Sequence, residues 1–108
     1  ALSAAKLITR NFKEQFEKVD IIAMPTSPET AFSLGAKTDD PIEMYNSDVF
    51  TIFANLTGMP AISVPCGLAK NGLPVGIQFM ADSFCEQKLL NSAYAYECAR
   101  GLVARPKI

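Results

Sequence analysis

Three polar residues, Asp48, Thr51 and Asn55, lie in a segment that otherwise reads as an apolar helix. They stand at positions i, i+3 and i+7, so on an α-helix their side chains share one face. A carboxylate at the wall of a cleft could bind a cationic group such as a substrate amine, while the hydroxyl and the amide orient the ligand. Tyr45 and Asn46 could add polar contacts from the preceding turn. The pattern therefore indicates a candidate substrate site.

The same residues also have a purely structural interpretation. Ser47 or Asp48 could cap the start of the helix, and Asn55 could help to close its far end. A carboxylate in the first turn would in addition interact favourably with the helix dipole. The spacing by itself leaves both interpretations open.

Other polar positions could also meet a ligand. Thr26 and Ser27 follow a short apolar strand, and ligands often bind beyond the carboxyl ends of strands; their hydroxyls could equally bond the local backbone. Gln78 interrupts an apolar strand, so it faces either a polar pocket or solvent. Ser63 and Cys66 stand near a glycine but lack a base within the chain, which argues against Cys66 as a nucleophile.

The composition excludes several functional classes. Since the 108 residues include no histidine, the chain cannot assemble a Ser-His-Asp or Cys-His mechanism by itself. The net charge of -1, with charges scattered along the chain, argues against a nucleic-acid-binding face. No apolar run is long enough to span a bilayer, and no metal set is expected. Cys66, Cys85 and Cys98 are expected to be reduced thiols, packed as small apolar side chains.

The elements that must position these residues are helices and strands in the manner of an α/β fold. Gly58 and Pro60 stop the middle helix, whose apolar stripe is Val49, Ile52, Phe53 and Leu56. The pair Asn71 and Gly72 favours a direct hairpin, a capping box from Ser83 opens the last helix, and Gly101 stops it. The predicted elements are a helix over residues 2–18, a strand over 21–24, a loop, a helix over about 45–57, strands over 61–66 and 75–80, and a helix over about 83–100.

Five segments follow one another in a fixed order and spacing along nearly the whole chain. They are 19–28 (VDIIAMPTSP), 40–45 (DPIEMY), 48–51 (DVFT), 55–67 (NLTGMPAISVPCG) and 73–78 (LPVGIQ). Together they resemble the amidase signature family, and most closely its group of A subunits of glutamyl-tRNA(Gln) amidotransferases. The series is much more specific than any one of its motifs.

The resemblance implies both a fold and a chemistry. The family builds a mixed β-sheet flanked by helices, of which residues 1–108 would be a single C-terminal fragment. The family's catalytic residues are a Ser, a second Ser with a cis peptide bond and a Lys. They lie in a Gly- and Ser-rich segment that this chain lacks, so no catalytic residue is expected here. Asp48 matches the family aspartate that holds the α-amino group of glutamine. Weaker contacts are expected from Thr51, Tyr45 and Asn55.

The resemblance also implies partners. The intact protein would release ammonia from glutamine in the cytoplasm and pass it to a B subunit. The B subunit would use ATP and Mg²⁺ and contact the tRNA, and a small C subunit would clamp the other two. No cofactor is expected in this chain and no membrane is involved. Two alternatives stay open: another amide hydrolase of the family, and a non-catalytic interaction module. Made alone, the chain is expected to self-associate through open strand edges and apolar surface.

Overall fold

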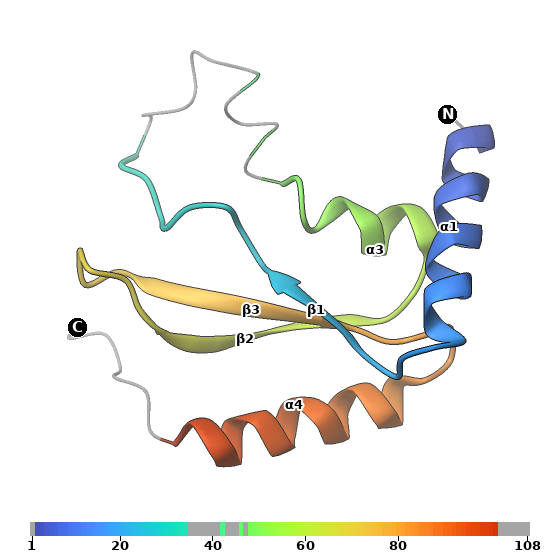
Figure 1. Cartoon of the computed structure of the whole chain (residues 1–108). Helices are drawn as coiled ribbons and strands as arrows, with labels where there is room; N and C mark the ends of the chain where they lie inside the picture. The colour runs from blue at the N-terminus through green and yellow to red at the C-terminus, as the bar shows by residue number, and fades with distance from the viewer. Residues whose placement is uncertain (1, 35–41, 43–45, 47, 102–108) are drawn as a thin grey trace.

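The computed structural model describes residues 2–34, 42, 46 and 48–101. Its helices and strands follow the predicted order (Figure 1). They are α1 (Leu2–Phe16), β1 (Ile22–Pro25), α3 (Ile52–Thr57), β2 (Ala61–Leu68), β3 (Pro74–Met80) and α4 (Glu86–Arg100). Within the described part, no helix is long and apolar enough to cross a membrane.

The three strands form one sheet in the order β1-β3-β2, and β3 pairs antiparallel with both neighbours. The outer strands therefore run parallel to each other on either side of β3. Met24 and Ser63 stand opposite Gln78 from the two sides, so these three side chains share one face of the sheet. The direct pairing of β2 with β3 confirms the hairpin that the sequence favours.

The hairpin turn is longer than two residues, because Ala69 donates its backbone N–H to the carbonyl of Leu73 at 2.8 Å and closes the loop there. Within it, the Asn71 side chain accepts the Leu73 N–H at 3.1 Å, and Gly72 takes a φ of 83°. That left-handed conformation suits glycine, which is why the Asn71 and Gly72 pair is a turn signal.

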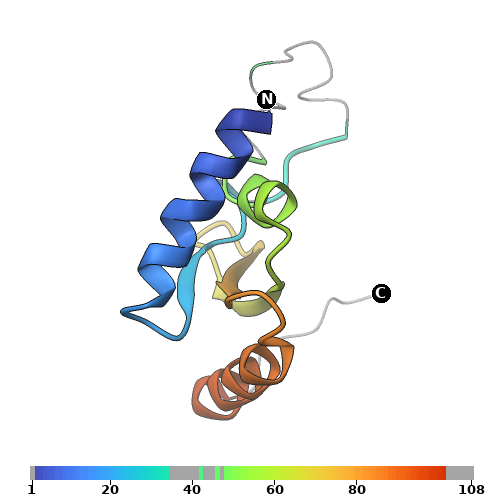
Figure 2. The same ribbon diagram turned by 90° about the vertical axis from the view of Figure 1, so that its right-hand side faces the viewer.

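Helices cover both faces of the sheet, with α4 below it and α1 and α3 above it in the two views (Figures 1 and 2). The side facing α4 holds a buried apolar cluster, in which the strand residues Val64 and Phe79 pack with Leu89 and Ala93 of α4. Phe79 and Tyr96 meet edge to face with ring centroids 5.5 Å apart. On the other side, α1 and α3 pack together through Phe12 and Phe53, whose ring centroids lie 5.4 Å apart.

The middle helix is shorter than predicted. It begins at Ile52 rather than near residue 45, and residues 48–51 form a turn. The cause is local: Val49 donates its N–H to Asn46, and Thr51 donates to Asp48, both three residues back, so this segment is wound more tightly than an α-helix. Tyr45 and Ser47 lie outside the described residues. The end is as predicted, since Gly58 takes a φ of 70° and donates its N–H to Ala54.

The predicted capping box of the last helix is wrong. The helix begins at Glu86, and its N-cap, Cys85, makes no side-chain capping bond. Phe84 has a φ of 63°, which breaks the helical path between Ser83 and Glu86, and the Ser83 N–H is donated instead to the Asp82 carboxylate at 2.8 Å. The predicted stop at Gly101 is confirmed, because its N–H is donated to the Glu97 carbonyl.

Candidate functional site

The turn before α3 presents the Asp48 side chain. Its main-chain carbonyl accepts the N–H groups of Thr51 and Ile52, both at 3.2 Å, and the Thr51 hydroxyl at 3.2 Å. The main chain of Asp48, and not its carboxylate, therefore closes this turn. The N-cap of α3 is Thr51, and it makes no side-chain capping bond.

The Asp48 carboxylate is exposed, and the residues that the structure describes offer it no hydrogen bond or ion pair. The lysines of the described ion pairs are engaged elsewhere, Lys13 with Asp82 at 3.4 Å and Lys88 with Asp20 at 3.1 Å. An exposed carboxylate on an ordered turn can accept hydrogen bonds from an ammonium group.

The other members of the predicted polar stripe are placed differently. Thr51 is half-buried and bonded to Asp48, so the structure brings these two together. Asn55 is exposed on α3, one helical turn further along. The prediction for Tyr45 falls outside the described residues.

Gln78 is the buried polar residue of the described chain, with 4% of its surface exposed. Its side-chain amide donates to the main-chain carbonyl of Phe50 at 3.0 Å. The interpretation of Gln78 as a residue on a solvent-exposed face is therefore wrong. The amide bonds the turn that carries Asp48, a contact that sequence reasoning missed because it joins residues 28 apart.

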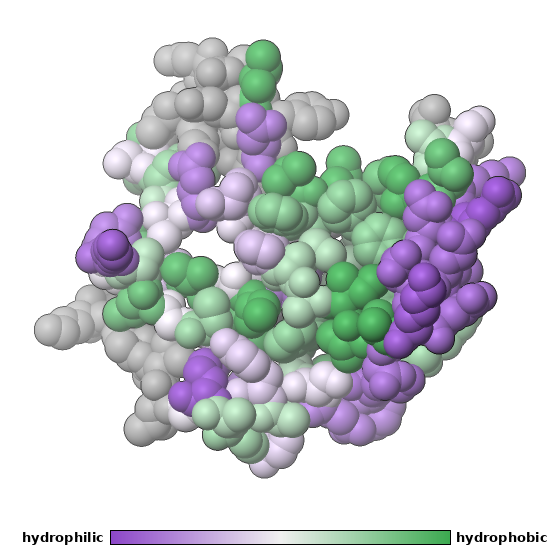
Figure 3. Space-filling model, in the orientation of Figure 1, coloured by the Kyte–Doolittle hydropathy of each residue, from purple (hydrophilic) through white to green (hydrophobic). Residues whose placement is uncertain are grey.

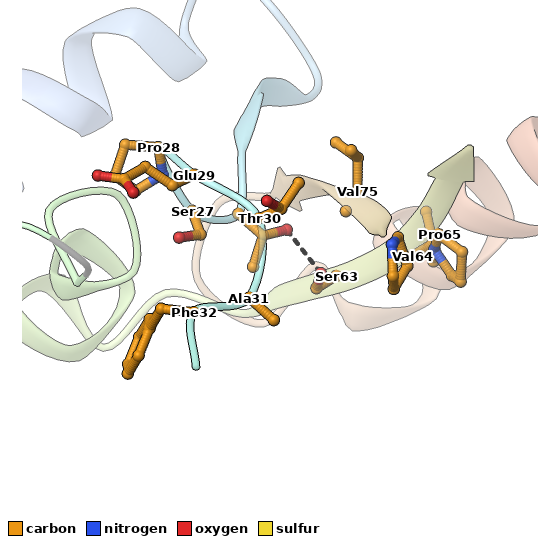
Figure 4. Close-up of a pocket in the computed structure, with 13 residues that line it drawn as sticks. Ser27, Pro28, Glu29, Thr30, Ala31, Phe32, Ser63, Val64, Pro65 and Val75 are labelled. Carbon is orange, nitrogen blue, oxygen red and sulfur yellow. Dashed lines mark hydrogen bonds between the residues drawn. The ribbon is translucent and has the colours of Figure 1, made fainter. Parts of the chain in front are cut away.

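A pocket of about 580 Å³ lies beyond the end of β1 (Figure 4). The loop of residues 27–32 and the strand residues Ser63, Val64 and Pro65 line it, together with Thr26, Pro74, Val75 and Gly76. Thr26 and Ser27 thus line a cavity, one of the two possibilities that their place after a strand left open. The Thr26 hydroxyl bonds the Ser63 hydroxyl at 2.6 Å rather than the local backbone.

The cysteines are all free in the structure, as expected. Cys66 is half-buried and points its thiol at the Val75 carbonyl, with the sulfur 3.4 Å from the oxygen. Cys85 is also half-buried, whereas Cys98 is exposed, so the prediction of a packed thiol is wrong for Cys98. Among the described residues, no cluster of three or more His, Cys, Asp or Glu side chains could hold a metal ion.

Similar proteins share both the sequence and the fold. The A subunit of glutamyl-tRNA(Gln) amidotransferase from Syntrophus aciditrophicus strain SB is 58% identical over 91 residues, which cover 84% of this chain and 19% of that protein. The crystal structure of the corresponding A subunit from Thermotoga maritima matches with a TM-score of 0.77 and 43% identity, over 82% of this chain and 19% of that one.

A second solved structure, 6-aminohexanoate cyclic dimer hydrolase complexed with substrate, matches with a TM-score of 0.71 and 26% identity, over 94% of this chain and 23% of that one. The chain spans about a fifth of the length of the curated relatives that it matches. A sequence model of the family described as Amidase matches residues 1–90. With this match over most of its length, the chain belongs to the amidase family.

Proposed function

We propose that this chain is the C-terminal part of the glutamine-hydrolysing A subunit of a glutamyl-tRNA(Gln) amidotransferase. Such a protein releases ammonia from glutamine for the transamidation of misacylated Glu-tRNA(Gln). The proposal is supported by the identity to proteins of that name and by the motif series along the chain. The observation that carries it is the Asp48 carboxylate, exposed and unpaired within the described residues on a turn bonded to the sheet.

In this proposal, Asp48 binds the α-ammonium group of glutamine. The bond between the ammonium group and the Asp48 carboxylate holds the amino acid at one end. The side-chain amide of glutamine then lies at a fixed distance from Asp48. Thr51, Asn55 and Tyr45 add weaker polar contacts around the same group. The chain contributes to the substrate site and supplies none of the catalytic groups.

The remainder of the protein would carry the Ser-Ser-Lys machinery. One serine attacks the glutamine amide carbon, the leaving amide nitrogen takes a proton and departs as ammonia, and water then releases glutamate from the acyl-enzyme. The ammonia passes to the B subunit, which uses ATP and Mg²⁺ and contacts the tRNA, while the C subunit holds the complex together in the cytoplasm. This chain alone is then inactive.

A second candidate is an amide hydrolase of the same family with another substrate. The likeness to 6-aminohexanoate cyclic dimer hydrolase over 94% of the chain favours it. The two candidates differ in what Asp48 does, because an aryl or lipid amide without an ammonium group has nothing to pair with the carboxylate.

The test uses the full-length protein in its complex and two amides, glutamine and glutaramate, which is glutamine without its α-amino group. Asp48→Asn is expected to raise KM for glutamine roughly 10- to 100-fold, the value of a charged hydrogen bond, and to leave kcat nearly unchanged. Hydrolysis of glutaramate is expected to change little. Asp20→Asn is the matched control, because this exposed carboxylate pairs with Lys88 on α4 instead. An unchanged KM for glutamine in Asp48→Asn would refute the role of Asp48.

A further inference from the structure

A buried amide at the centre of the sheet, that of Gln78, bonds the turn that carries Asp48. Gln78 lies on β3, the middle strand, and both of its neighbouring strands are bonded to β3 at this level. Burying an amide costs free energy unless it is hydrogen-bonded. A methionine or leucine would fill the same position without that cost, so the hydrogen bond that Gln78 makes explains its presence.

That hydrogen bond ends close to Asp48. The Gln78 amide donates at 3.0 Å to the carbonyl of Phe50, two residues after Asp48 in the same turn. Since Asp48 accepts the N–H groups of Thr51 and Ile52, the main chain from Asp48 to Ile52 is a single bonded unit. Any constraint on the Phe50 carbonyl is therefore a constraint on the backbone of Asp48.

The turn depends on such tertiary contacts for its position. Helix α3, which follows it, has only six residues, and a helix of that length is not stable by itself. The described contacts that tie this region to the rest of the chain include the Phe12 and Phe53 ring pair on the side of α1 and the Gln78 bond on the side of the sheet. Of these, the Gln78 bond is the nearer to Asp48 along the chain.

We propose that Gln78 is a positioning residue: its buried amide fixes the turn of residues 48–51 on the central strand so that the Asp48 carboxylate is held where it meets the substrate ammonium group. The inference rests on the proposed role of Asp48. A rigid strand is a better platform for such a contact than a loop, because a displacement of about 1 Å in a positioned group is enough to weaken binding strongly.

The test compares Gln78→Met with Gln87→Met in the full-length protein within its complex. Methionine matches glutamine in length and shape and removes the donor. Gln87 makes its own side-chain bond to Asn91 at 2.9 Å on the exposed surface of α4, across the sheet from α3. The control variant therefore carries the same substitution and also loses a side-chain hydrogen bond, but that bond does not contact the turn of Asp48.

Gln78→Met is expected to raise KM for glutamine about 3- to 10-fold, the range of one hydrogen bond, and to leave KM for glutaramate and both kcat values nearly unchanged. In the Asp48→Asn background, Gln78→Met is expected to change KM for glutamine by less than about 2-fold, because the two residues act through one contact. Gln87→Met is expected to behave as the unsubstituted protein. A purely structural role of Gln78 would impair both amides equally.

The two proposals fail in different ways. If Asp48→Asn leaves KM for glutamine unchanged, the proposed function is wrong. If Asp48→Asn raises it but Gln78→Met does not, or raises it equally for both amides, the positioning role is wrong. Should Gln78→Met fail to fold, Gln78→Asn retains the amide but shortens its reach by one methylene, and the same selective loss for glutamine is expected.

Discussion

The hydroxyl oxygens of Thr26 and Ser63 lie 2.6 Å apart, although Thr26 directly follows β1 and Ser63 belongs to β2, on the opposite side of β3. The two hydroxyls can meet across β3 because the β3 residue between them is Gly76, which has no side chain. A Cβ at Gly76 would stand 3.0 Å from each of the two oxygens. Thr26 also donates its N–H to the Gly76 carbonyl at 3.2 Å, so the absence of a side chain at Gly76 permits a polar contact across the strand.

Gly76→Ala is expected to lower the stability of the full-length protein by about 1–3 kcal/mol, the usual effect of overpacking. The methyl group must push the two hydroxyls apart and weaken their bond. The measurement is the thermal unfolding midpoint of the full-length protein. In the Ser63→Ala background the same substitution is expected to lower the midpoint less, because one of the two close contacts is gone. An equal loss in both backgrounds would contradict the steric explanation.

The Phe12 and Phe53 rings are expected to couple α1 to α3. Ring pairs of this kind contribute about 0.5–1.5 kcal/mol beyond the area that they bury. A double-mutant cycle with Phe12→Leu and Phe53→Leu, read by thermal unfolding of the full-length protein, is expected to show a coupling of that size. Phe12→Leu paired with Tyr94→Leu, whose ring is exposed on α4, provides the control. Strictly additive losses for Phe12 and Phe53 would rule out the coupling.

Asp82 is expected to make stability depend on acid pH. The Ser83 backbone N–H, and to a smaller degree the Lys13 ammonium group, hold the pKa of the Asp82 carboxyl below its ordinary value of 3.8, against an opposing effect of desolvation. A pKa that is lower in the folded than in the unfolded state stabilises the fold above about pH 3.8, and this contribution disappears as the pH falls through the folded-state value.

Melting curves of the unsubstituted protein and of Asp82→Asn, recorded from neutral pH down to strong acid, test this expectation. The unsubstituted protein should melt higher at neutral pH, and the difference should shrink below about pH 3.8. Lys13→Met is the control, and it should retain part of the pH dependence because the Ser83 N–H bond also lowers the Asp82 pKa. A difference between the two curves that does not vary with pH would refute the assignment.

The chain made alone is expected to self-associate. Figure 3 shows hydrophobic residues gathered between α3 and the sheet, beside the hydrophilic outer surface of α1. The predicted apolar stripe leaves Val49, Ile52 and Leu56 exposed. Light scattering of the isolated chain should give a mass above that of a monomer, and Ile52→Lys with Leu56→Lys should lower it. A monomer without these substitutions would overturn the expectation.

Local chemistry was sufficient to predict the order of the elements. Apolar periodicity marked the helices and strands, and Gly58 and Gly101 ended helices as expected because each takes a conformation with positive φ that other residues rarely adopt. The hairpin of β2 and β3 also follows from residues that are neighbours in the chain. Helix starts were predicted less well, since the tight turn at residues 48–51 and the left-handed Phe84 leave no clear signal in the sequence.

The candidate site also combines contacts that the local sequence predicts with contacts that only the fold creates. The sequence by itself determined that Asp48 and Thr51 would lie close together, because they are three positions apart within one turn, and the motif series indicated the family. Only the tertiary structure decided that Gln78 is buried against the Phe50 carbonyl and that Thr26 meets Ser63 over Gly76. Those contacts join residues 28 and 37 positions apart. They depend on the register of three strands, a property of the folded sheet that no local pattern of residues encodes.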